Sequence, residues 1–209
     1  MELTRRCNRF VSSVLLGLSG LSALVAHAET GAPSTAPLPA QRAAFILVAS
    51  KQLADPSYRQ SVILVVPVRD DLHVGLIVNR PTNNSLASAF PDHAPSKKVV
   101  DPIYFGGPML SGAMLALVQA AEAPGGGSIA MLDGLYLCTQ GAVIDQVIET
   151  RPNQARYFAG AVLWRPGELE AELERGFWHA MDAEIGQVLR ANPEPLWHEL
   201  IGLALAVRT

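Results

Sequence analysis

Few side chains beyond the N-terminal region could do chemistry: one cysteine, four scattered histidines and an Asn–Arg pair. Cys138 ends a strand-like run and precedes a helical stripe, and a thiol at a helix N-terminus can have a lowered pKa and act as a nucleophile. No histidine stands at the spacing of a known thiol enzyme, so the alternative role of Cys138 is that of a small buried hydrophobe. The chain has no GxSxG elbow and no HxxxH, HxH or CxxC motif. We therefore expect no catalytic residue, no metal site and no cofactor, and we expect His73, His93, His179 and His198 at the surface or in caps.

Asn79 and Arg80 form the most informative polar pair, because they end a strand-like run. The planar guanidinium of arginine fits a carboxylate or a phosphate, and ligands often meet open sheets at strand ends. The alternative is that Arg80 holds a loop carbonyl or an acidic neighbour. Gly106 and Gly107, in "IYFGGPM", either line the same groove or only allow a sharp turn, since neither GxGxxG nor the Walker pattern is present. Asn79, Arg80, Gly106 and Gly107 are the candidate ligand-binding residues.

Strand-like runs that would position these residues dominate the first two thirds of the chain. They cover residues 43–50, 61–68, 73–80, 103–109, 113–120, 129–132, 135–138 and 156–164. "RDDL" and Asp133-Gly134 predict two hairpins. Asp55-Pro56 predicts a short helix or turn, and Asn84 or Ser85 is expected to cap another short helix.

Helical patterns dominate the last third. Helices are expected at 141–149, 165–191 and 194–206, the last docking Leu196, Leu200 and Leu203. The alternating glutamates of the second helix are expected on a solvated surface: Glu168, Glu170, Glu172 and Glu174. The three tryptophans are expected in the core with their indole N–H groups satisfied: Trp164, Trp178 and Trp197. Strands in front and helices behind predict a single α/β (α+β) domain, a mixed sheet packed against helices.

Residues 1–28 have the composition of a secretory signal peptide. Three arginines precede the apolar run "FVSSVLLGLSGLSALV", and "AHA" fits the cleavage pattern, so we expect cleavage after Ala28 and a periplasmic or secreted protein. An uncleaved membrane anchor is the alternative, because the apolar run nearly reaches spanning length. Residues 29–42 are rich in Pro, Ala, Ser and Thr and predict a flexible linker, which leaves residues 43–209 as the domain.

Charge argues against nucleic acid as a partner. The 209 residues carry a net charge of −3, and removal of 1–28, which holds three arginines and one glutamate, leaves −5. DNA binding rests mainly on Lys and Arg that neutralise phosphates. After cleavage only Cys138 remains as a thiol, so no intramolecular disulfide can form.

Three blocks of the sequence resemble the AlgH/YqgE family of bacterial proteins. They are "DPSYRQSVILVV…HVGLIVNRP", "IYFGGPM" and "LWRPGELEAELERGFW…LW", and they span nearly all of residues 43–206. The resemblance implies a single domain with a mixed, largely antiparallel sheet packed against helices. Family members are often described as transcriptional regulators, and they usually lack an export signal. Val66-Pro67-Val68 stand where the family often has a polar, His-containing stretch, and the family offers no agreed catalytic residues.

The combined expectation is an exported, non-enzymatic binding or accessory protein with an unknown protein or small-molecule partner. Its groove would lie near Asn79, Arg80 and the Gly106-Gly107 turn. A transcriptional regulator, as the family label suggests, and an unrecognised hydrolase or thiol enzyme are the alternatives. No membrane contact is expected beyond the signal peptide.

Overall fold

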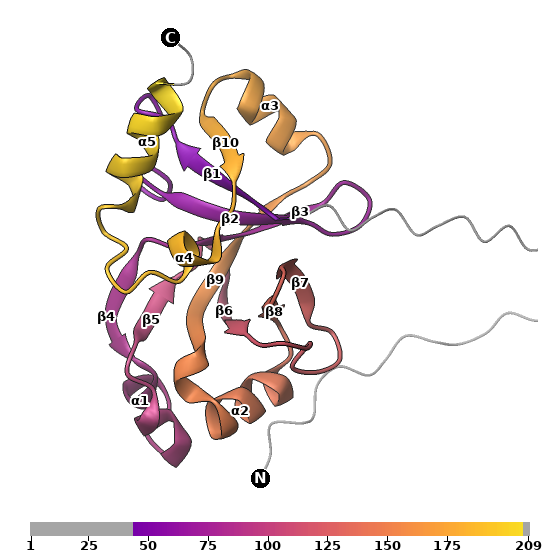
Figure 1. Cartoon of the computed structure of the whole chain (residues 1–209), viewed down its shortest axis with the longest axis vertical. Helices are drawn as coiled ribbons and strands as arrows, with labels where there is room; N and C mark the ends of the chain where they lie inside the picture. The colour runs from indigo at the N-terminus through magenta and orange to yellow at the C-terminus, as the bar shows by residue number, and fades with distance from the viewer. Residues whose placement is uncertain (1–43, 207–209) are drawn as a thin grey trace, which may run out of the picture. The chain divides into compact units, whose positions relative to one another are not determined.

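The computed structural model describes residues 44–206, and the expected signal peptide and linker lie outside them. These residues form ten strands, five α-helices and two short 3₁₀ helices (Figure 1). The strands are β1 Phe45–Ala49, β2 Val62–Pro67, β3 His73–Ile77, β4 Pro81–Ser85, β5 Pro102–Phe105, β6 Met109–Gln119, β7 Ile129–Leu132, β8 Leu135–Cys138, β9 Ala155–Trp164 and β10 Trp178–Asp182. The helices are α1 Leu86–Ala89, η1 Ala94–Lys98, α2 Gly141–Thr150, η2 Pro152–Gln154, α3 Glu168–Glu174, α4 Ile185–Val188 and α5 Leu196–Ala206.

The strands form one mixed, largely antiparallel sheet, as the sequence predicted. Its main order is β10-β1-β2-β3-β9-β6-β8-β7, with β5 paired to β9 and β4 paired to β5. The β5–β9 pair is parallel, and the other pairs are antiparallel. The long strand β9 is central, because it pairs with β3 near its end and with both β5 and β6 near its start.

The segment between β5 and β6 crosses over the face of β9. At Ala159 the strand β9 pairs with Phe105 of β5 and with Met114 of β6, so β5 and β6 occupy its opposite edges. Gly106 donates its N–H to Ala159 (2.9 Å) and accepts from Ile77 N (2.9 Å), at the point where β9 changes partner from β5 to β3. The crossing thus falls on the glycine pair whose role the sequence left open.

Glycine is required on both sides of this crossing. A Cβ built on Gly160, whose φ is +75°, would lie 2.3 Å from the carbonyl oxygen of Gly107. A Cβ on Gly106 would lie 2.2 Å from the carbonyl oxygen of Gly160. Real Cβ atoms do not approach backbone atoms this closely. The 106–107 segment and strand β9 can therefore touch only because neither carries a side chain at this point.

The sheet buries apolar side chains on both faces. One cluster joins β1, β2 and β3 to α3, α4 and α5, and Figure 1 shows α5 alongside β1. The other cluster joins β6 and the start of β9 to α2 and α1. Strand β6 contributes to both, since Leu115 and Leu117 face the first cluster whereas Ala116 and Val118 face the second. No helix among residues 44–206 is long and apolar enough to cross a membrane.

Several local predictions are confirmed. Asp133-Gly134 joins β7 to β8 in a hairpin, and Ser85 caps α1 with a reciprocal pair of bonds to Ser88. Asp55 caps a turn through its bond from Ser57 N (2.7 Å). All three tryptophans are buried, and each indole N–H has an acceptor.

One helix prediction is wrong, and another is confirmed in part. The expected helix over 165–191 is broken, because α3 ends at Glu174, Gly176 takes a φ of +71°, and β10 then pairs with the edge of β1. Of the three leucines expected to dock from α5, Leu196 and Leu200 are buried as predicted, whereas Leu203 is 55% exposed. The buried face of α5 also includes Trp197, Ile201 and Ala204.

The crossing predicts a large effect of one added methyl group. Gly160→Ala should lower the free energy of unfolding by about 3 kcal/mol or more, because it combines a left-handed φ with a backbone clash. Urea denaturation followed by tryptophan fluorescence measures the loss. Gly202→Ala is the control: nothing lies within 4 Å of its Cβ in α5, so it should stabilise by about 0.5–1 kcal/mol. Equal stability of Gly160→Ala and the parent chain would contradict the crossing.

Candidate functional site

Asn79 uses its whole side chain to fasten the start of β2. Its Oδ1 accepts from Val62 N (2.8 Å), and its Nδ2 donates to the carbonyl of Gln60 (3.0 Å). Gln60 has a φ of +58°, so the amide holds a backbone conformation that few residues adopt unaided. Asn79 is only 9% exposed, and its role in the fold is structural.

Arg80 closes the turn that precedes β2. Its Nη1 donates to the carbonyls of Ser57 (2.6 Å) and Pro56 (3.3 Å), and its Nη2 donates to the carbonyl of Arg59 (2.6 Å). Burial lowers the pKa of Arg80, and the charge of Arg59 lowers it further. The guanidinium therefore holds loop carbonyls, which is one of the two roles that the sequence allowed.

A shallow pocket of about 330 Å³ lies beside these two residues. Its lining is Pro56, Arg59, Gln60, Asn79, Arg80, Glu194, Trp197 and His198. Arg80 is linked by its carbonyl to Phe105 N (2.9 Å), next to the glycine pair, but Gly106 and Gly107 are buried against β9 and line no part of this pocket. The bond between Phe105 and Arg80 makes the two pairs neighbours, but only Asn79 and Arg80 line the pocket, and ligand binding by the four residues stays a prediction.

Glu172 lies between two tryptophans, although its sequence pattern predicts a solvated surface. The alternating glutamates were expected on a solvated surface, yet Glu172 Oε2 accepts from the indoles of Trp164 (2.9 Å) and Trp178 (2.7 Å). The two rings meet edge-to-face with centroids 6.3 Å apart. The sequence contained a clue to this role of Glu172. Two tryptophans expected in the core need acceptors for their indole N–H groups, and an acidic helix lies next to both in the sequence.

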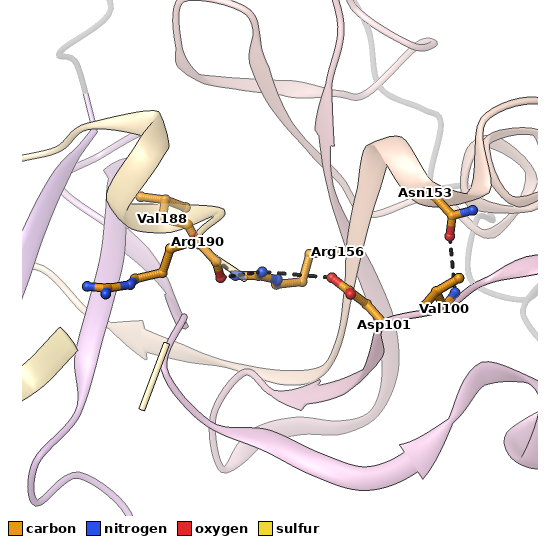
Figure 2. Close-up of polar contacts among 6 residues, drawn as sticks. All are labelled: Val100, Asp101, Asn153, Arg156, Val188 and Arg190. Atoms are coloured by element: carbon orange, nitrogen blue, oxygen red, sulfur yellow. Dashed lines mark hydrogen bonds and ion pairs between the residues drawn. The ribbon is translucent and has the colours of Figure 1, made fainter. Parts of the chain in front are cut away.

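Arg156 is the most deeply buried charge among the described residues, at 3% exposure. Figure 2 shows its guanidinium between the α4 segment and Asp101. It donates to the carbonyls of Val188 (2.8 Å) and Arg190 (2.9 Å), and Asp101 lies 3.8 Å away. The guanidinium also sits 4.4 Å from the centre of the Tyr104 ring. Burial lowers the pKa of Arg156. Its contacts join the α4 segment, Asp101 and strand β5 to β9.

Cys138 is placed where a nucleophile is not expected. It is 1% exposed, and its Sγ lies 3.5 Å from the Ser128 hydroxyl. Burial raises the pKa of the thiol, which favours the unreactive protonated form. The interpretation as a small buried hydrophobe is therefore the one that the geometry favours.

An apolar groove opens beside the unpaired part of β6. Strand β8 pairs with β6 only over Ala116–Gln119, so the backbone edge of residues 112–115 on that side has no strand partner within the described part of the chain. The groove, of about 420 Å³, is lined by Phe90, His93, Gly112, Ala113, Met114, Thr139, Gly141, Ile144, Asp145 and Ile148. Met109 and Leu110, at 48% and 53% exposure, extend the apolar surface along the same strand.

Comparison with known proteins identifies the family of the chain. A family model described as AlgH-like matches residues 46–205. The chain belongs to the AlgH-like family. A UPF0301 protein of Streptomyces coelicolor is 31% identical over 163 residues, which are 75% of this chain and 83% of the relative. A UPF0301 protein of Rhodococcus jostii is 29% identical over 181 residues, 85% and 90% of the two chains.

Solved structures share the fold of this AlgH-like chain. The AlgH protein from Pseudomonas aeruginosa has a TM-score of 0.64 at 22% identity and covers 82% of this chain and 96% of its own. A protein of Corynebacterium diphtheriae has a TM-score of 0.63 at 21% identity, covering 76% and 84%. The sequence-based assignment to the AlgH/YqgE family is confirmed.

The contacts of Arg80 predict a stability effect rather than only a binding effect. Arg80→Met should cost about 2–4 kcal/mol of unfolding free energy, because three carbonyls lose a charged donor. Arg59→Met is the matched control. Its side chain is exposed and raises the electrostatic cost of charged Arg80, so stability should change by less than about 0.5 kcal/mol. Chemical denaturation of both variants checks this, and equal losses would argue against a structural role for Arg80.

Proposed function

We propose that this AlgH-like chain is an exported, non-enzymatic binding protein that captures an extended segment of another protein along β6. The observation that carries the proposal is the coincidence of an unpaired strand edge with an apolar groove. An extended peptide can add to such an edge through main-chain hydrogen bonds, while pockets for alternate side chains give specificity. The buried polar groups already described are engaged inside the fold, so they leave little for catalysis.

The groove sets the chemistry of the partner segment. Its walls come from Met114 on β6, Phe90 after α1 and Ile144 on α2, so alternate side chains of the partner should be apolar. Asp145 is exposed on the α2 side and favours a Lys or Arg at one end of the segment. The register of β6 on β9 shifts between Met109 and Met114, where Leu110 has a φ of +54°, so the regular edge is short. A segment of about seven residues, roughly 23 Å when extended, is long enough to cover it.

Export of the chain is the second part of the proposal, and it rests on residues 1–28. A net charge of −5 after cleavage supports an envelope or extracellular protein partner over DNA, and it gives no support to the regulator label carried by the family.

Strand addition is tested with heptapeptides selected by phage display on the tag-free chain. Each selected peptide is then synthesised in two forms, with N-methyl groups on the odd or on the even residues. Only one form should lose affinity, by more than tenfold, because alternate N–H groups of an added strand face the edge. Equal binding of both forms would contradict strand addition.

The location is tested with two glycine variants. Gly112→Phe should weaken the same peptides more than tenfold, because Gly112 lines the groove and nothing lies within 4 Å of its Cβ. Gly202→Phe, on the exposed face of α5 with equally open space, should leave the affinity unchanged. Loss of binding in both variants, or in neither, would place the peptide elsewhere.

Export is tested by fractionation of the native host and intact-mass analysis. The expected species is periplasmic or secreted and begins at Glu29. A species that retains Met1 and stays with the cytoplasmic fraction would contradict export and would make the regulator label worth testing. Failure of this experiment leaves the peptide experiments unaffected, so the two parts fail separately.

A further inference from the structure

We propose that Asp71, His73 and Glu170 form a binding site for a divalent transition-metal ion, with Zn²⁺ as the ion of first choice. One ring nitrogen of His73 and one carboxylate oxygen from each acid all lie within 4.8 Å of one another. This site is separate from the groove beside β6 and from the pocket beside Arg80.

His73 supplies the observation that an acidic pair alone would lack. It was expected at the surface, but it is 5% exposed, so this expectation is wrong. Its Nδ1 is buried and has no hydrogen-bond partner among the described residues. Leaving a buried polar atom unpaired costs free energy, and a ligand in the adjoining cluster is one way to compensate the ring.

The fold holds the imidazole in place. His73 begins β3, pairs with Pro67 on β2 and with Trp164 on β9, and packs edge-to-face on Phe45 with ring centroids 6.3 Å apart. The backbone of His73 is thus held between two strands and its ring packs on Phe45, so the ligand is pre-organised, which lowers the entropic cost of binding an ion.

The two carboxylates reach the ring from segments that are also fixed. Asp71 lies in the β2–β3 turn with a φ of +60°, and the turn is closed by the bond from Leu72 N to the Arg69 carbonyl (3.0 Å). Glu170 is on α3, which begins four residues after Trp164, the partner of His73. The side chain of Glu168 accepts from Arg165 N (2.8 Å) and sets the start of that helix.

The donor set selects the class of ion. One imidazole nitrogen with two carboxylate oxygens suits borderline metals such as Zn²⁺, whereas Mg²⁺ and Ca²⁺ prefer oxygen donors alone. Three protein ligands leave at least one position for water. Both carboxylates are exposed, so the ion has a path from solvent.

The test is isothermal titration of the full, tag-free chain with ZnCl₂, accompanied by thermal unfolding with and without the metal. We expect saturable one-to-one binding and a higher melting temperature with Zn²⁺, because an ion that binds only the native state stabilises it. Co²⁺ should give a visible absorption band, whereas MgCl₂ and CaCl₂ at the same concentration should give neither effect.

Surface variants make the test independent of folding. Asp71→Asn and Glu170→Gln should each weaken Zn²⁺ binding more than tenfold and remove the Co²⁺ band, because each loses a charged ligand. Asn tolerates the left-handed φ at 71, so the turn is kept. Asp70→Asn, whose φ is +53°, and Glu174→Gln, on the same helix as Glu170, are the matched controls and should bind like the parent chain.

Two results would overturn the proposal. One is the absence of saturable binding by the parent chain. The other is binding that survives both Asp71→Asn and Glu170→Gln. If that binding is lost in His198→Gln, the ion belongs to an exposed histidine outside this cluster.

Discussion

The contact on which the rest of the fold depends is a backbone crossing without side chains. Gly106 and Gly107 pass over Gly160, and this allows β5 and β6 to occupy opposite edges of β9 although only a few residues separate them. The same point is where β9 exchanges β5 for β3, so both apolar clusters meet along one strand. A side chain at any of these glycines would push the two halves of the sheet apart.

Several polar groups of the interior hold this architecture together. Arg156 gathers α4 and the segment before β5 onto β9, Arg80 and Asn79 fasten the turn before β2, and Glu172 receives two indoles. Arg156, Arg80 and Glu172 each form hydrogen bonds to partners within the chain, which offset the desolvation penalty of a buried charge.

The sequence predicted what depends on local patterns. Asp133-Gly134, the Ser85 cap and the apolar runs of β1, β2 and β9 are all read from neighbouring residues, and the family resemblance supplied the sheet. Strand β10 was not predicted from the sequence, because the residues after Gly176 continue a helical pattern. They form a strand only because they pair with the edge of β1. The Asp71–His73–Glu170 cluster was not predicted for a similar reason. The pairing of β3 with β9 brings its members together, and no spacing motif in the sequence marks them.

The sequence order of β5, β6 and β9 affects when the crossing can form during folding. Strands β5 and β6 come before β9 in the sequence. The segment that joins them therefore cannot cross β9 until residues 155–164 have been synthesised. Until then both strands present unpaired edges, and the late strand must enter between two partners at once. Non-local pairing of this kind makes folding slow and leaves intermediates prone to aggregation. A chain that crosses a membrane before folding would meet this problem with all its strands already present, whereas one that folds during synthesis would wait for β9.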